Sequence, residues 1–231
     1  LRRKTIASLR SYLADFLGAL AAAGRAPAGL ADRLPPHRHV RRESDPHLWT
    51  AEEIRRLLAR IDRQSATGKR DYAMILTTAR LGLRVSDLRG LELGDLDWRA
   101  KQITIVQHKT GRPLRLPLLD DVGWAIIDYI RDGRPETACP KVFIKHRHPF
   151  DAFGSSSSVA TRLPRHAARA GMEFPPGQVC GMHSLRGALA VAMIGGGTPI
   201  PVVAAVLGHA CSDTTQAYYL RFDVERLRGC A

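Results

Sequence analysis

Cysteine is scarce in this chain of 231 residues, and its four cysteines are widely separated, at Cys139, Cys180, Cys211 and Cys230. They form no C-x-x-C pair, and no histidine stands at zinc-ligand spacing from them, which argues against a zinc finger or a redox dithiol. We expect reduced, structural thiols, as is usual in a cytosolic protein.

Long hydrophobic runs and nucleotide-binding motifs are missing as well. No apolar stretch approaches the roughly 20 residues that span a bilayer, and no signal-like segment opens the chain. The sequence has neither a P-loop lysine motif nor three acidic residues at metal-binding spacing. These absences argue against a membrane-spanning protein and against P-loop nucleotide chemistry.

Positive charge, by contrast, is abundant. Lysine and arginine number 35 against 22 acidic residues, which gives a formal net charge of +13 and a pI near 10.3. A surplus of this size points to a polyanionic partner. Nucleic acid fits best; an anionic membrane surface is the competing partner.

Hydrophobic periodicity predicts a mainly helical fold around a small antiparallel hairpin. The hairpin is expected from Gln102–Gln107 and the alternating leucines 114, 116 and 118, joined by a turn at His108–Gly111. Val142–Ile144 is a candidate short strand. Helices are expected at Lys4–Ala23, Thr50–Ile61, Lys69–Leu81, Val85–Leu91, Asp121–Arg131, Val159–Ala170, Leu185–Ile194, Ile200–Leu207 and Thr214–Leu220.

Residues 34–49 are predicted to link two parts of the chain. This stretch is rich in proline, arginine and histidine, a composition typical of an extended segment. Its charge fits a solvated linker and one that lies along a DNA backbone equally well. The chain begins with Leu1, which suggests a piece of a longer protein or a shortened version of it.

Four residues near the C-terminal end form a pattern suited to phosphodiester chemistry. His183 and Arg186 are three apart and share one helical face, so both can point at one anion. His209 follows Gly208, and Tyr218 lies nine residues later. Each residue alone is weak evidence, but together they supply several donors for phosphate oxygens and one hydroxyl nucleophile.

With these segments placed, the chain resembles the tyrosine recombinases, the phage-integrase family of site-specific DNA recombinases. The first shared motif is Leu81-Gly82-Leu83-Arg84-Val85-Ser86-Asp87-Leu88, and the second comprises His183–Arg186, Leu207–His209 and Thr215–Tyr218. Lys109-Thr110-Gly111 occupies the hairpin where the family places a lysine.

The resemblance implies a mainly α (α+β) fold in which residues 50–231 form the helical catalytic domain with its small antiparallel sheet. Residues 1–33 then correspond to the C-terminal helical remnant of the family's core-binding domain, whose earlier helices are absent. No cofactor, nucleotide or metal is expected, because the phosphotyrosine intermediate keeps the free energy of the phosphodiester for resealing.

The resemblance also implies a role for each motif residue. Tyr218 would attack phosphorus and form a 3′-phosphotyrosyl link, while Arg84 and Arg186 would hold the non-bridging oxygens. Arginine suits that task because its planar fork donates to two oxygens at once.

The remaining four residues would move protons or hold their neighbours. Lys109 would protonate the departing 5′ oxygen, and His183 is a candidate general base near the tyrosine. His209 would donate to a phosphate oxygen. Asp87 more plausibly orients Arg84 or His183 than takes a proton.

Two positions have rivals, and one departs from the family pattern. Tyr219 adjoins Tyr218 and competes as nucleophile, although the interval from His209 favours Tyr218. Lys101 competes with Lys109, which the K-T-G turn favours. Gly187 stands where the family often has histidine, and glycine costs about 1 kcal/mol inside a helix.

The implied partner is double-stranded DNA, bound by a homo-oligomer, a tetramer on paired sites held through the tail at residues 219–231. Arg162 and Arg165 on the expected helix Val159–Ala170 are candidates for base contacts. We expect a bacterial cytoplasmic, DNA-associated protein; phage integration, transposition and chromosome resolution stay open as its role. An inactive DNA-binding relic and a type IB topoisomerase are the alternative functions.

Overall fold

The computed structural model describes all residues except 1–2, 36–46, 155–158, 176–177, 179 and 209–231. It divides the chain into two compact units, Leu1–Ser44 and Asp45–Ala231. The expected helix Thr214–Leu220 lies outside the described residues. Across the described helices, none combines the length and apolar character needed to cross a membrane.

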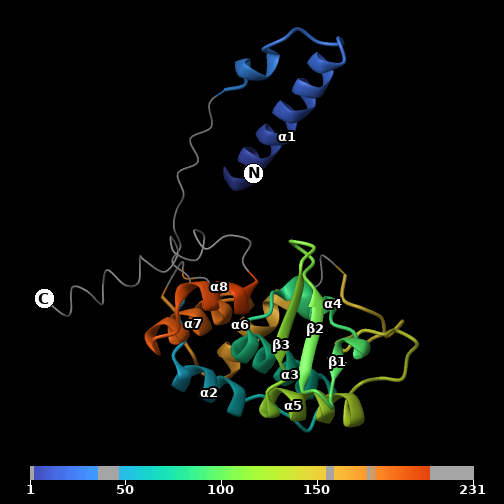
Figure 1. The fold of residues 1–231 in the computed structure, drawn as a ribbon, viewed down its shortest axis with the longest axis vertical. Coiled ribbons are helices and arrows are strands. Elements are labelled where there is room, and N and C mark those ends of the chain that lie inside the picture. The colour runs from blue at the N-terminus through green and yellow to red at the C-terminus, as the bar shows by residue number, and fades with distance from the viewer. Residues whose placement is uncertain (1–2, 36–46, 155–158, 176–177, 179, 209–231) are drawn as a thin grey trace, which may run out of the picture. The chain divides into compact units, whose positions relative to one another are not determined.

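The first unit consists of helix α1 (Arg3–Ala22) and the short 3-10 helix η1 (Leu30–Arg33) (Figure 1). Arg10 of α1 ties the two together, since its Nε donates to the carbonyl of Pro35 at 2.7 Å. Several large apolar side chains of α1 are exposed: Ile6, Leu9, Tyr12, Leu13 and Phe16. An apolar stripe of this kind is typical of a helix that packs against a further element.

The second unit is mainly helical with one small sheet, so the expected fold class is confirmed (Figure 1). Its elements are α2 (Ala51–Ala59), α3 (Ala66–Leu81), α4 (Val85–Gly90), η2 (Leu93–Asp95), β1 (Leu96–Asp97), β2 (Gln102–Val106), β3 (Pro113–Pro117), α5 (Asp120–Asp132), α6 (Val159–Arg169), α7 (Met182–Gly195) and α8 (Ile200–Leu207).

The helix boundaries follow from local chemistry. Thr50 and Glu53 form the predicted capping box that starts α2. Ser65 caps α3, whose N-terminal Gly68 N–H donates to the Ser65 hydroxyl. Gly82 and Gly208 end α3 and α8 in the left-handed conformation, with φ of 64° and 58°.

Helix α3 is the centre of the core. It packs against α2, α4, α5 and α7, and most of its residues are buried. The antiparallel sheet has the order β1-β2-β3 and buries Ile103, Ile105, Leu114 and Leu116 on one face. The predicted hairpin is therefore confirmed, and the alternation of buried and exposed residues follows from the strand period of two.

Two expectations need correction, and one strand was not predicted. Val142–Ile144 is not a strand: these residues are fully buried in an irregular segment, in which Ile144 forms only an isolated bridge with Ala152, and the preceding Lys141 forms one with Glu92. The apolar character of this short run therefore indicates burial and not strand pairing. The strand β1 was not expected. Helix α7 begins at Met182, so His183 lies inside it, and buried Gly187 does not interrupt it.

Candidate active site

The C-terminal end of α8 brings two arginines of the sequence motifs together. Arg186 of α7 donates from Nη2 to the carbonyl of Leu207 at 2.6 Å. Arg84, at the start of α4, donates from Nη2 to the carbonyl of Gly208 at 2.9 Å. The last carbonyls of a helix carry partial negative charge, so they favour cations at this place. The two guanidiniums are thereby fixed on neighbouring peptide groups.

Arg186 is buried, with 3% of its surface exposed. Its Nη1 also donates to the carbonyl of Gly82 at 2.5 Å, at the end of α3. One side chain thus connects the ends of α3 and α8 from its position on α7. A buried guanidinium held by several carbonyls stays charged and well oriented.

Gln107 at the end of the hairpin completes the surroundings of Arg84. The hydrogen-bonding neighbours orient its amide: the oxygen faces Arg84 Nη1 at 2.8 Å, and the nitrogen faces the carbonyl of Gly208 at 3.0 Å. A Cβ at position 208 would collide with this amide. Close approach and a positive φ therefore both require glycine there. No motif in the sequence marks Gln107 as a site residue.

Asp87 links α4 to the hairpin. Its buried carboxylate accepts from the backbone N–H of His108 at 2.9 Å and lies 3.8 Å from Arg84 Nη1. The N–H belongs to the residue that precedes Lys109. Asp87 thus holds the base of the turn that carries the lysine, in addition to standing beside the arginine.

Lys109 and His183 lie close enough to interact electrostatically. His183 keeps an exposed face, but protein atoms around its ring shield it in part from water, and this shielding, followed by the charges of Arg186, Arg84 and Lys109, lowers its pKa. Its imidazole is therefore neutral at neutral pH. Lys101, the rival of Lys109, is at the other end of β2 and pairs with Asp120 at 2.8 Å.

A buried hydrogen bond fixes the start of α7. The indole N–H of Trp49 donates to the hydroxyl of Ser184 at 2.7 Å, and that hydroxyl donates to the carbonyl of Gly181 at 2.7 Å. Ser184 is the neighbour of His183, so the segment before α2 helps to set the orientation of the motif that contains His183 and Arg186. No local pattern in the sequence predicts this contact.

The structure brings five of the predicted site residues into one region: Arg84, Asp87, Lys109, His183 and Arg186. The other two, His209 and Tyr218, and the rival Tyr219, lie outside the described residues. The described part of the chain contains no group of three or more histidine, cysteine, aspartate or glutamate side chains placed to hold a metal ion. What the region offers is a set of positive donors beside a neutral imidazole, which suits binding of a phosphate diester.

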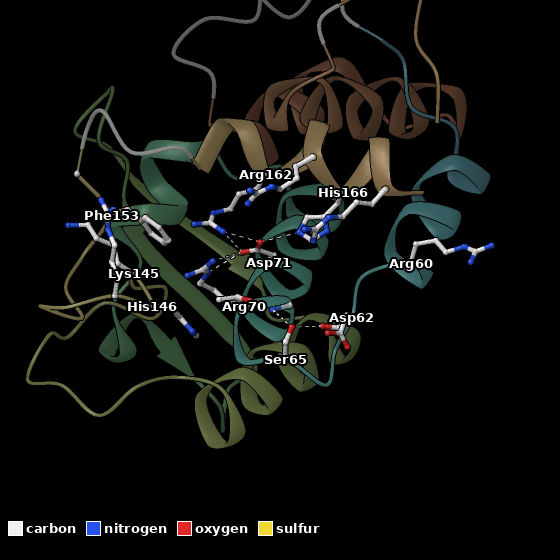
Figure 2. A pocket seen from close by; sticks show the side chains of 16 residues that line it. Arg60, Asp62, Ser65, Arg70, Asp71, Lys145, His146, Phe153, Arg162 and His166 are labelled. Carbon is white, nitrogen blue, oxygen red and sulfur yellow. Dashed lines mark hydrogen bonds and ion pairs between the residues drawn. The ribbon is translucent and has the colours of Figure 1, made fainter. Parts of the chain in front are cut away.

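Arg162 and Arg165, the candidates for base contacts, take different positions on α6. Arg162 turns inward and donates from Nη1 to both carboxylate oxygens of Asp71, at 2.9 and 3.0 Å. Arg165 is exposed. Both line a second basic cavity, at the N-terminal end of α3 (Figure 2).

Comparison with known proteins identifies the family. The sequence matches the phage integrase family over residues 48–225. The chain is 38% identical over 219 residues to the y4rA protein of Sinorhizobium fredii, described as an integrase/recombinase, covering 95% of this chain and 52% of that protein. It is 31% identical over 179 residues to the tyrosine recombinase XerD of Neisseria meningitidis, covering 75% and 58%.

Solved structures show the same fold. A λ integrase dimer bound to a core site matches with a TM-score of 0.67 at 17% identity, covering 90% of this chain and 70% of that chain. The XerA recombinase matches with a TM-score of 0.63 at 23% identity, covering 79% and 66%. The chain therefore belongs to the phage integrase family of tyrosine recombinases, and it spans about half the length of the first curated relatives it matches.

Proposed function

We propose that this chain is the catalytic part of a site-specific DNA recombinase that cuts and rejoins strands through a covalent 3′-phosphotyrosyl intermediate. The observation that carries the proposal is the anchoring of Arg84 and Arg186 on successive carbonyls at the end of α8. Two fixed guanidiniums beside a neutral histidine form a receptor for one phosphate group.

In the proposed cleavage step, the phenol oxygen of Tyr218 attacks phosphorus while the bond from phosphorus to the 5′ oxygen breaks. The phenol has an ordinary pKa of about 10, so it needs a base at neutral pH. Neutral His183 accepts the phenol proton, and Lys109 gives a proton to the departing 5′ oxygen. The products are a 3′-phosphotyrosine and a 5′-hydroxyl.

The other site residues act on the charge that develops at phosphorus. Arg84, Arg186 and His209 donate to the non-bridging oxygens. Asp87 keeps the lysine turn and Arg84 in place through its contacts with His108 and Arg84. Attack by a different 5′-hydroxyl reverses the step and reseals the strand, so neither a metal nor a nucleotide takes part.

A duplex with a nick close to the cleavage point tests the proposal. The short strand released by cleavage diffuses away, so the covalent adduct accumulates and runs as a shifted band on a denaturing gel. We expect an adduct from the unaltered chain and none from Tyr218→Phe, with Tyr219→Phe as the matched control. An adduct that persists in Tyr218→Phe would exclude that tyrosine.

The adduct experiment, combined with assays of supercoil relaxation and of exchange between two sites, separates the alternative functions. DNA binding without an adduct would support the inactive relic. An adduct together with relaxation of supercoiled DNA, but without exchange between two sites, would support a type IB topoisomerase. Strand exchange, together with a tetramer that is lost when residues 219–231 are removed, would support the recombinase and its proposed assembly. The DNA that flanks the gene supplies the duplex to test and decides between phage, transposon and chromosomal roles.

A further inference from the structure

Asp71, in the first turns of α3, carries a buried carboxylate that the catalytic set does not use. It accepts from Arg70 Nε and Nη2 at 3.0 and 2.9 Å, and from Arg162 Nη1 at 2.9 and 3.0 Å (Figure 2). Its Oδ2 also lies 3.0 Å from His166 Nε2. The side chains of Asp71 and His166 are each 8% exposed. A single carboxylate therefore holds three basic groups.

The network around Asp71 contains more positive than negative charge. Burial by itself would raise the pKa of Asp71, but the hydrogen bond to His166 and the charges of Arg70 and Arg162 outweigh it and lower the pKa to about 2. One negative charge thus faces two permanent positive charges. The Phe153 ring lies beside both guanidiniums, with its centroid 5.3 Å from Arg70 Cζ and 5.2 Å from Arg162 Cζ.

Helix α6 has two contrasting faces. Val159, Leu163 and Ala167 are buried in the core. The basic residues stand at positions 162, 165, 166 and 169, a spacing that places them along one face. The inner members, Arg162 and His166, meet Asp71, whereas Arg165 and Arg169 are exposed.

This basic face lines a cavity of about 840 Å³. The other cationic lining residues are Arg60, Arg70, Lys145 and Arg147, against the acidic Asp62 and Asp71. The cavity therefore carries a surplus of positive charge at its rim, and a polyanion is the partner that this charge attracts. Asp71 precedes Gly82 by 11 residues, so it lies about 16 Å along α3 from the residue whose carbonyl accepts from Arg186.

We propose that Asp71 is a positioning residue for DNA binding: it holds Arg162 and His166 against α3 and so fixes α6 with Arg165 and Arg169 directed at backbone phosphates. The inference rests on the proposed function, because it takes DNA as the polyanion. Without the carboxylate, Arg70 and Arg162 would repel each other, and a buried charge without its partner displaces the helix that carries it. Asp71 acts on binding, since it is far from the reacting phosphate.

The test compares Asp71→Asn with the unaltered chain on a 30-base-pair duplex and on the nicked duplex. We expect the Kd for DNA to rise by about tenfold. The plot of the logarithm of the binding constant against the logarithm of the salt concentration should become less steep by the equivalent of about two phosphate contacts. The cleavage rate at saturating DNA should stay within about twofold of the unaltered rate, because the catalytic donors are untouched. Asp71→Glu, which keeps the charge, should recover part of the affinity.

Two further variants make the result specific. Arg165→Gln/Arg169→Gln alters only exposed residues and should weaken binding and flatten the slope to the same extent. Adding Asp71→Asn to it should then change little, because both act through the same contacts. Asp128→Asn is the matched control. Asp128 is on α5 and accepts from Nζ of Lys69 on α3 at 2.6 Å, so the variant alters an ion pair of α3 with α5 and leaves α6 unchanged. It should leave the Kd unchanged.

Asp71→Asn/Arg162→Met covers the case in which the single variant does not fold, since it removes a charge from each side of the pair. It should fold and show the same loss of affinity. A folded Asp71 variant with the Kd and salt slope of the unaltered chain would overturn the inference. A loss of rate at saturating DNA with unchanged Kd would do so as well. An unaltered chain that binds DNA but forms no adduct would contradict the proposed function alone.

Discussion

The carboxylate of Asp87 accepts a hydrogen bond from the backbone N–H of His108 at 2.9 Å, and this contact joins α4 to the turn between β2 and β3. The same carboxylate lies 3.8 Å from Arg84. In the proposed mechanism, the residue therefore connects the two parts of the site that would act on different oxygens of the phosphate: the arginine on a non-bridging oxygen and the hairpin lysine on the leaving one.

Asp87→Ala is expected to slow cleavage and to destabilise the domain. The change leaves the His108 N–H without its acceptor and Arg84 without its nearby charge, a loss of about 1–3 kcal/mol in the free energy of unfolding. Urea unfolding and single-turnover cleavage of the nicked duplex measure the two effects. Asp87→Asn keeps an acceptor for His108 and should retain more stability. Equal stability of Asp87→Ala and the unaltered chain would contradict this role.

Lys109→Ala should slow cleavage of ordinary DNA and cleave normally when sulfur replaces the 5′ bridging oxygen. A thiolate is a far weaker base than an alkoxide, so it departs without a proton from lysine. The measurement is the rate of adduct formation on the two substrates. Lys101→Ala is the control and should behave like the unaltered chain on both, because it loses only an exposed ion pair with Asp120. The reverse pattern would identify Lys101 as the acid.

Arg84→Ala and Arg186→Ala should differ in stability although both reduce the rate. Loss of one donor to a developing oxyanion costs about 10²–10³ in rate. Arg84 is more exposed than Arg186, and the Gly208 carbonyl that it holds keeps the amide of Gln107 as a donor, so its removal should lower the stability less than removal of Arg186. Removal of Arg186 also leaves the carbonyls of Gly82 and Leu207 without this donor, which adds about 1–3 kcal/mol of destabilisation. Cleavage rates and denaturant midpoints of the two variants provide the comparison; equal midpoints would count against the structural role of Arg186.

The cleavage rate should rise with pH through the titration of His183, with the midpoint of the rise below the ordinary histidine pKa of about 6.5. The base acts when neutral, and the local environment lowers its pKa, so the rising limb moves toward acid. Lys109→Ala removes one of the positive charges that lower this pKa, and on the sulfur-containing substrate its limb should move to higher pH. If the rising part of the pH–rate profile does not move in Lys109→Ala, or if it is still present in His183→Gln, the result would argue against His183 as the base.

The sequence allowed most of the elements and the motif residues of the site to be predicted. Apolar spacing located the helices, and strand alternation located the hairpin, because both patterns report which residues share a buried face. The i, i+3 relation of His183 and Arg186 likewise followed from helical geometry. Val142–Ile144 was misassigned because a short apolar run is equally compatible with a buried loop.

The contacts that organise the site were beyond such reasoning. Arg84 meets Gly208 across 124 residues, and Arg162 meets Asp71 across 91. Which carbonyl or carboxylate a guanidinium reaches depends on how the helices pack, and no local periodicity encodes that. The sequence by itself determined the helices of the described part of the chain, the hairpin and the candidate site residues. Only the tertiary structure decided which of those residues meet, since long-range contacts arise when several buried faces pack around α3 at once.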